Sequence, residues 1–488
     1  MTMNPTVPGG TLQKVPALGV TLRSSPDAGR SLWKFYIVLW AVLAILSAIL
    51  YKVGAPWQVP LVIMAPVTLA GIAWRPLFGL SLMAALAPIG LAFAWGSIFS
   101  AEKGLGILLT LGTLAHLVAT RKAFRFDNIN VLTLAVLTLL SLLSITWSVY
   151  PPLSASYSFT LFQLFVYVAL TLAIVRKPQD LAWPLRCFVV SSILTTVLPH
   201  VLGFSMAQGQ RFTIGLSAEQ VINPDRLAGL LGLGCLSSIY LFRTRPSAFW
   251  KIICIIGMVV TPVGVVLTGT RKVFFVLALM PLLPLLSPQA IARRRGLVAV
   301  LVIVAILLAG AMWVALEYWT PEQTAWRLTD PEYAKNSINF RLLLIDEAVA
   351  YVASHPLGAG MGCFFTSTGN LVHNDLFYVL SSLGLPGASL FAVYLGWMLV
   401  RSWRMKAGMD KWFAQAIVVY HVLLGLAATW IYFKHVWLFM TFASLLWTFQ
   451  TESGQEGVSS PRSVSPPGID PLGGQSVRND ASARPFRA

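Results

Sequence analysis

Three side chains in the second half of the chain have the chemistry to act on an anionic substrate: Arg271, Arg341 and His373. A guanidinium group binds phosphate through paired hydrogen bonds, and an imidazole that is neutral at neutral pH can take a proton from a hydroxyl. Residues of these types could bind an anionic ligand and take a proton from a hydroxyl.

Arg271 and Lys272 end a short polar turn, Thr268-Gly269-Thr270, between two apolar runs. The turn is too short to form a domain, so both cations are expected at the depth of the lipid headgroups. We consider Arg271 a catalytic candidate and Lys272 a substrate-binding candidate. The alternative is that both are snorkelling residues that bind ordinary lipid phosphate.

Arg341 begins a predicted amphipathic helix over 339–353, which should lie on the membrane surface or pack against the spans. Its apolar face comprises Leu342, Leu343, Ile345, Val349 and Val352. Arg341 near the helix start favours an anion there; the alternative is a salt bridge to Asp346 or Glu347. His355 and the proline after it end the helix, so we interpret His355 as structural.

His373 stands with Asn374 at the mouth of the next span, and Asn374 is a substrate-binding candidate. The alternative is that Asn374 or Asp375 caps the helix. Arg211, in the loop 205–226, is a further substrate-binding candidate that would close over a substrate; the alternative is an ordinary polar loop with a turn at Asn223-Pro224.

The elements that must position these residues are membrane spans. The chain is 57% hydrophobic and 11% charged, with a mean hydropathy of +0.74, far from the balance of a soluble protein. Apolar runs long enough to span recur throughout, so we predict an all-α, polytopic transmembrane protein with about 12–14 spans. The expected spans are 32–51, 59–74, 77–95, 105–120, 131–150, 158–175, 181–204, 227–242, 249–268, 273–286, 297–316, 376–400, 413–433 and 434–449.

The distribution of Lys and Arg predicts the orientation. Alternate connections are rich in basic residues, and the positive-inside rule assigns these to the cytoplasm, with both termini. The net charge of +17 is therefore explained by topology and not by nucleic-acid binding. The other connections are poor in basic residues except at 205–226, 269–272 and 317–375, where an anionic ligand on the outer face is the simplest explanation.

We divide the chain into an N-terminal cytoplasmic tail (1–31), a first set of spans (32–316, with the outer loop 205–226), a periplasmic catalytic loop with short amphipathic helices (317–375), a second set of spans (376–449) and a disordered cytoplasmic tail (450–488). The four cysteines lack paired spacing, and the outer loops carry no cluster of acids, so we expect no disulfide, metal or cofactor.

The order of these motifs resembles the O-antigen ligase and O-antigen polymerase (Wzy-type) superfamily of bacterial inner-membrane glycosyltransferases. The similarity lies in 205–400: an Arg-x-x-x-Gly loop with Asn-Pro, a Thr-Gly-Thr-Arg turn, an arginine-led helix ending in His-Pro-Leu-Gly-x-Gly, and His-Asn at a span mouth followed by Leu-Gly-x-x-Gly. By motif, Arg271, Arg341 and His373 match the family's two functional arginines and its essential histidine.

The resemblance implies a GT-C-like fold and metal-independent, inverting transfer of a glycan from an undecaprenyl-diphosphate donor to an acceptor hydroxyl at the periplasmic face. The expected product is a surface polysaccharide such as O-antigen or exopolysaccharide, made by a polymerase; the alternative is a ligase that transfers to lipid A-core in lipopolysaccharide biosynthesis. Other polysaccharide-assembly proteins are potential partners.

Two other classes stay open. A flippase or transporter of lipid-linked oligosaccharide would need a polar path through the spans, yet none of the eighteen Asp and Glu residues falls inside one. A non-catalytic membrane subunit that binds anionic lipid would need only the snorkelling basic residues.

Overall fold

The computed structural model describes residues 33, 36–47, 58–88, 94–95, 99–124, 126–202, 205–208, 211–214, 223–244, 247–281, 283, 330–369 and 372–456. The expected tail 1–31, the span 297–316, the first part of the periplasmic loop and residues 209–210 and 215–222 of the loop 205–226 lie outside these residues, as does the C-terminal tail beyond 456.

The chain folds as an all-α, multi-pass membrane protein. Six described helices are long and apolar enough to cross a membrane. The elements are α2 (Gln58–Trp74), α3 (Pro76–Leu86), β1 (Ala94–Trp95), β2 (Phe99–Ser100), α4 (Ala101–Thr120), α5 (Ile129–Ser144), α6 (Pro151–Ile174), the 3₁₀ helix η2 (Pro178–Leu181), α7 (Ala182–Leu202), β3 (Ser205–Gln208), β4 (Arg211–Ile214), α8 (Pro224–Thr244), α9 (Ala248–Leu267), α10 (Arg271–Leu279), α14 (Pro331–Ser354), α15 (Phe364–Thr368), α16 (Asp375–Arg404), α17 (Met409–Gly425) and α18 (Lys434–Glu456).

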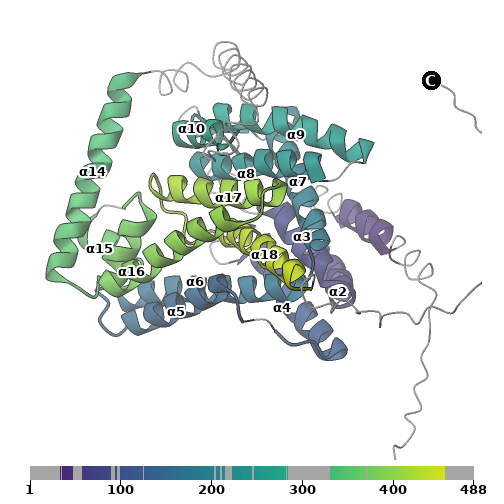
Figure 1. The fold of residues 1–488 in the computed structure, drawn as a ribbon, viewed down its shortest axis with the longest axis horizontal. Helices are drawn as coiled ribbons and strands as arrows, with labels where there is room; N and C mark the ends of the chain where they lie inside the picture. The colour runs from purple at the N-terminus through teal and green to yellow at the C-terminus, as the bar shows by residue number, and fades with distance from the viewer. Residues whose placement is uncertain are drawn as a thin grey trace, which may run out of the picture.

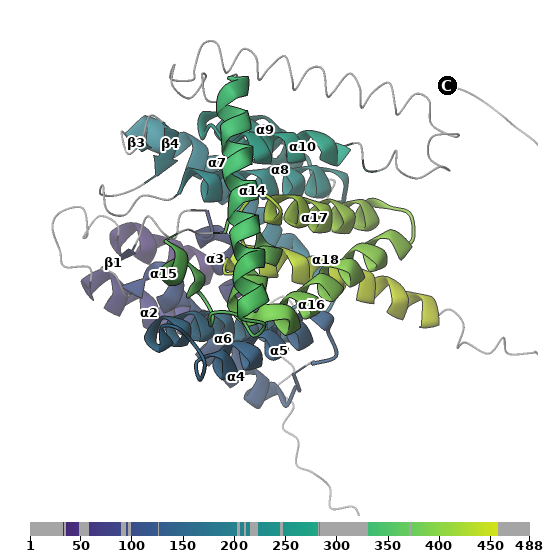
Figure 2. The same ribbon diagram turned by 90° about the vertical axis from the view of Figure 1, so that its left-hand side faces the viewer.

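The helices form a bundle, and α14 crosses one end of it. In Figure 1, α5, α6, α8 and α17 run roughly parallel to one another, with α5 beside α6 and α8 beside α17, while α14 stands nearly perpendicular to them at the left edge. Figure 2 shows α14 in front of the bundle from that side. We call this end of the bundle the α14 face. A helix that lies across the ends of spans is in the position of a surface helix.

The expected helix 339–353 is confirmed but begins earlier, at Pro331. Asp330 accepts hydrogen bonds from the backbone N–H groups of Glu332 (3.0 Å) and Tyr333 (3.2 Å), and proline occupies the first helical position, which is a standard helix start. Only part of the predicted apolar face packs against the rest of the protein. Leu344, Ala348 and Val352 are buried, whereas Leu342, Leu343 and Val349 are exposed.

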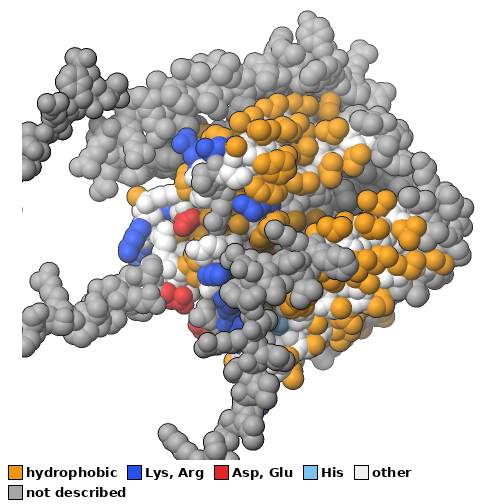
Figure 3. All heavy atoms as spheres, turned by 90° about the vertical axis from the view of Figure 1, so that its right-hand side faces the viewer, with side chains coloured by type: hydrophobic (Ala, Val, Ile, Leu, Met, Phe, Trp, Pro, Cys, Tyr) orange, Lys and Arg blue, Asp and Glu red, His pale blue; other side chains and the backbone are white. Residues whose placement is uncertain are grey.

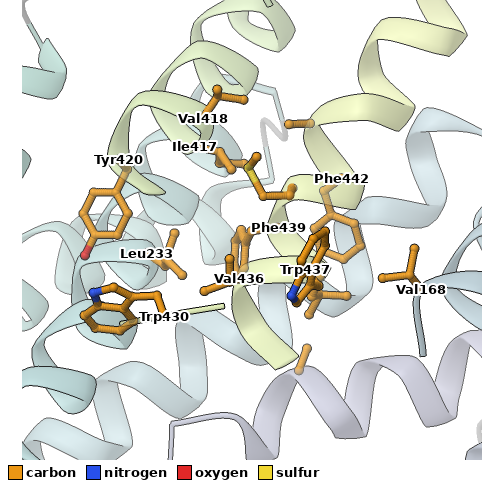
Figure 4. Close-up of a cluster of buried hydrophobic side chains, with 14 of the residues drawn as sticks. Val168, Leu233, Ile417, Val418, Tyr420, Trp430, Val436, Trp437, Phe439 and Phe442 are labelled. Carbon is orange, nitrogen blue, oxygen red and sulfur yellow. The ribbon is translucent and has the colours of Figure 1, made fainter. Parts of the chain in front are cut away.

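The hydrophobic core extends through most of the described helices, and one part of it lies where α8, α17 and α18 meet. Figure 4 shows Tyr420 and Trp430 beside Leu233, next to a group of side chains from α18. The Tyr420 hydroxyl donates to the carbonyl of Gly229 (2.9 Å), and the Trp437 indole donates to the carbonyl of Ile431 (2.7 Å). These bonds satisfy buried polar atoms in an otherwise apolar core.

Several helix boundaries differ from the expected spans; the expected span 77–95, for example, is the helix α3, which ends at Leu86. The run 413–433 is not one helix, because α17 ends at Gly425 and residues 426–433 form a loop. The buried carboxylate of Asp375 accepts the backbone N–H groups of Trp430 (2.6 Å) and Ile431 (3.0 Å), which competes with helical bonding there. The expected tail begins later than 450, because α18 continues to Glu456.

Helix α16 is broken at Gly384, which has a left-handed φ of 66°. The carbonyls of the helical turn before Gly384 accept hydrogen bonds from the loop that contains Gly358, Gly360 and Gly362. The Ala359 N–H donates to the Ser381 carbonyl (2.9 Å), and the Gly360 N–H donates to the Ser382 carbonyl (3.0 Å). The Leu-Gly-x-x-Gly motif is therefore a kink into which the His-Pro-Leu-Gly-x-Gly loop docks.

Gly384→Ala should destabilise the protein strongly. A Cβ atom there would collide with the backbone carbonyl of Pro356, and the positive φ adds strain for any other residue. We expect the melting temperature of the detergent-purified protein to fall by several degrees. Gly396→Ala, where a Cβ meets open space in the same helix, is the control and should change little.

The opposite end of the bundle carries many basic residues. Figure 3 shows Lys and Arg side chains gathered on the side of the molecule opposite α14. There the hydroxyl of Tyr240 binds Asp410 (2.8 Å), and Lys411 donates to the carbonyl of Trp403 (2.7 Å). Basic side chains therefore occur at this end as well as on the α14 face, and the predicted orientation stays a prediction.

Candidate functional site

The candidate site lies on the α14 face, where the N-termini of α8, α10, α16 and α18 meet. The loop 426–433 joins them. Asn374, before α16, donates to the carbonyl of Leu426 (3.2 Å), and Lys272 at the start of α10 donates to the carbonyl of Ala427 (3.4 Å). The N–H groups at helix N-termini favour anions, so their convergence makes this face suited to a negatively charged ligand.

The start of α10 is fixed to the start of α8 by an ion pair. Lys272 Nζ lies 2.6 Å from Asp225 Oδ2, and the Thr270 hydroxyl donates to Asp225 Oδ1 (3.2 Å). The Thr-Gly-Thr turn makes this possible because Gly269 adopts a positive φ of 66°. Asp225 was not a candidate from the sequence; the only local signal was its place after Asn-Pro at a helix start.

Arg271 points toward the beginning of α14. Its Nη2 donates to the carbonyl of Asp330 (3.1 Å), and its guanidinium lies 5.7 Å from the ring centroid of Tyr333. Arg271 and Lys272 are thus engaged with different neighbours: Arg271 with α14, Lys272 with α8 and the loop 426–433. Both are on the α14 face, and both bind protein groups.

His373 lies just before α16. Its side chain is exposed at the surface, but nearby protein atoms displace part of the water around the imidazole. This partial burial, with the positive charges of Lys272 and Arg341, lowers the pKa of His373 below its usual value, while Asp225 acts in the opposite direction. The imidazole is therefore neutral at neutral pH. Arg271 and Arg341 were both predicted to act with His373. Of these two, only Arg341 is among the charges that lower the pKa of His373; on α10 that effect comes from Lys272.

Arg341 is half-buried on α14. Among the described residues, no ion pair joins its guanidinium to Asp346 or Glu347, the alternative that the sequence left open. Arg211 begins β4, where it pairs with Gln208; its side chain lies outside what the structure describes.

Asn374 caps α16. Its Oδ1 accepts from the backbone N–H groups of Leu376 (2.9 Å) and Phe377 (3.2 Å), and its amide nitrogen donates to Leu426. The capping role that the sequence left open is thus present, and the predicted role of Asn374 in substrate binding stays a prediction. The cap fixes the backbone from which His373 projects.

Asp375→Ala should destabilise the α14 face. The mutation leaves two buried backbone N–H groups, those of Trp430 and Ile431, without their acceptor, which costs about 1–3 kcal/mol for each group. We expect a lower melting temperature and faster proteolysis within 426–433. Asp410→Ala, at the opposite end, removes one side-chain bond to Tyr240 and should cost less. Equal losses in the two variants would contradict this assignment.

An apolar cavity of about 330 Å³ lies between α16, α17 and α18. Asn374 and Asp375 line it at one end, with Leu395, Trp437 and Met440 further along. The cavity therefore runs from the polar N-terminus of α16 into the apolar part of the bundle.

No group of three or more His, Cys, Asp or Glu side chains that could hold a metal ion occurs in the described part of the chain. In comparisons with known proteins, no family model and no curated protein matches this chain.

Proposed function

We propose that the protein is a membrane glycosyltransferase that moves a glycan from an undecaprenyl-diphosphate donor to an acceptor hydroxyl on the α14 face. The observation that carries the proposal is that Lys272 and Asn374, the residue after His373, donate hydrogen bonds to the adjacent carbonyls of Ala427 and Leu426. The lowered pKa of His373, to which burial and the charges of Lys272 and Arg341 contribute, agrees with this arrangement. Two cations beside a neutral base match the needs of a diphosphate leaving group and a hydroxyl nucleophile.

In this mechanism the acceptor hydroxyl transfers its proton to His373 while its oxygen attacks the anomeric carbon. The bond between that carbon and the diphosphate oxygen breaks, and the diphosphate leaves with the electron pair. Lys272, Arg341 and Arg271 offset the growing negative charge without a metal. Attack from the side opposite the diphosphate inverts the configuration at the anomeric carbon. Arg211 and Asn374 are further candidates for contacts with the substrate.

The position of the donor follows from the same face. The cavity between α16, α17 and α18 suits part of a polyprenyl chain, because it is apolar and begins at Asn374. We infer from the basic residues at the opposite end of the bundle that the α14 face is periplasmic and that the membrane is the bacterial inner membrane, with both termini in the cytoplasm.

Incubation of the purified protein with a lipid-diphosphate glycan, with and without lipid A-core, tests the proposal. A ladder of longer lipid-linked products indicates a polymerase, which we favour, and transfer to lipid A-core indicates a ligase. Movement of the lipid-linked glycan across proteoliposomes with no new glycosidic bond would replace the proposal with the flippase alternative. If the protein alone turns over the donor, the non-catalytic subunit is excluded.

A further inference from the structure

A second group of basic and aromatic side chains lies on the other side of the α8 N-terminus, centred on Phe433. The guanidinium of Arg226 lies 4.5 Å from the Phe433 ring centroid, and the His435 ring stacks on the same phenyl at 5.5 Å. Trp430 stands edge-on to both rings, 5.6 Å from Phe433 and 5.9 Å from His435. We call Arg226, Trp430, Phe433, Lys434 and His435 the Phe433 cluster.

The positive charge of this cluster is incompletely neutralised. Lys434 Nζ lies 3.7 Å from Glu102 Oε2, the one acidic partner that the described residues provide for it. Arg226 forms no ion pair within the described part of the chain, and its buried Nε has no hydrogen-bond partner there. Arg226 and Lys434 thus face one carboxylate. An unpaired cation in a shielded position is costly unless a ligand neutralises it.

Two other buried donors in the cluster are also unsatisfied. Trp430 and His435 are each 2% exposed, and the nitrogen atoms Nε1 of Trp430 and Nε2 of His435 have no hydrogen-bond partner among the described residues. Buried side-chain nitrogens without partners are uncommon in native proteins. Here they occur beside the guanidinium of Arg226, which forms no ion pair among the described residues. The cluster therefore has hydrogen-bond donors and positive charge but few acceptors and little negative charge.

The Phe433 cluster is separate from the proposed transfer site. Asp225 and Arg226 are neighbours on α8 but engage different elements: Asp225 binds Lys272 on α10, whereas Arg226 covers Phe433 in the loop before α18. The N-terminus of α8 therefore divides the α14 face into two basic regions.

We propose that Arg226, Lys434 and His435 form a second anion-binding site, which takes a phosphate group carried by a ligand on the α14 face. A guanidinium, an ammonium and an imidazole donor supply several hydrogen bonds to the oxygens of one phosphate. The identity of the ligand rests on the proposed function. If that function is correct, the phosphate belongs to the acceptor lipid, and the donor diphosphate occupies the region of Lys272 and Arg341.

The site can be tested in the purified full-length protein in an uncharged, phosphate-free detergent. The Lys272→Gln/Arg341→Gln double variant removes the first basic region and serves as the background. We expect it to retain binding of inorganic pyrophosphate by calorimetry, and adding Arg226→Gln should weaken that binding about tenfold or more. Arg243→Gln, at the exposed far end of α8, is the matched control and should leave the affinity unchanged.

A stability measurement makes the test independent of binding. Without pyrophosphate, Arg226→Gln should keep or raise the melting temperature, because it removes one of two cations that share the single carboxylate of Glu102. An isoprenyl diphosphate that binds more tightly than pyrophosphate through Arg226 identifies a lipid-borne phosphate, and equal affinities identify a free one. The proposal is overturned if Arg226→Gln leaves pyrophosphate affinity unchanged, or if only a carboxylate sugar such as glucuronate binds through Arg226. If the protein binds pyrophosphate but does not transfer glycan, only the proposed function is contradicted.

Discussion

Replacing His373 by alanine should lower glycan transfer by a factor of about 10²–10⁴, the usual contribution of a general base. The imidazole lies at the α14 face, and burial with the charges of Lys272 and Arg341 lowers its pKa, so the neutral form that can accept a proton is favoured. The measurement is turnover of a lipid-diphosphate glycan by purified protein at saturating donor.

His355→Ala is the matched control. His355 is exposed, stacks on Tyr351 at 4.4 Å and shares a hydrogen bond with Ser354, so it has a local structural role at the end of α14. We expect this variant to keep most of its activity. If His373→Ala retains normal transfer and expression, His373 is not the base.

The pH dependence gives a second readout for His373. Because burial and the charges of Lys272 and Arg341 lower its pKa, the base stays neutral, and active, below the ordinary histidine value of about 6.5. Activity should fall only as pH drops through the lowered pKa. The sign for stability is the same: the unfolded chain takes up the proton more readily, so the His373 contribution is present above about pH 6.5 and is lost as pH falls through the folded pKa.

The parts of the site that could be predicted from the sequence depend on local signals. Asn374 marks a cap and His355-Pro356 marks a helix end, whereas the helix start at Asp330-Pro331 is an equally local signal that the expected range 339–353 missed. Each works through hydrogen bonds or steric contacts within a few residues. The Leu-Gly-x-x-Gly motif was visible as well, but its role as a kink emerged only with the loop that docks into it.

The remainder depends on contacts between residues far apart in the chain. Lys272 meets Asp225, Lys434 meets Glu102, and Asp375 holds Trp430. Nothing local distinguishes these acids and bases from ordinary loop residues. For the same reason the loop 426–433 was not predicted and was included in the expected span 413–433. Its hydropathy favours a span, and the contact that accounts for the end of the helix is with the distant carboxylate of Asp375.

Arg341→Gln and Lys272→Gln should each lower glycan transfer about 10²–10³-fold, as expected for loss of one charged group that stabilises the leaving diphosphate. Both substitutions also remove a cation that lowers the pKa of His373, so the pKa should rise and the acid limb of the activity profile should move to higher pH. A purely structural role would not produce that shift. Turnover measured between pH 5 and 8 provides both readouts.

Lys335→Gln is the control, because Lys335 is an exposed cation on the same helix as Arg341 and is not among the groups that act on His373. It should change neither turnover nor the acid limb. The double variant Lys272→Gln/Arg341→Gln should lose less than the product of the single losses if both cations bind one diphosphate, because partners of a shared ligand are not additive. Strictly multiplicative losses, or an unmoved acid limb, would show that the two cations act on separate groups and that His373 does not lie between them.

Arg271 gives the remaining distinction: it binds the carbonyl of Asp330, so Arg271→Gln should loosen α14 and lower transfer without moving the acid limb.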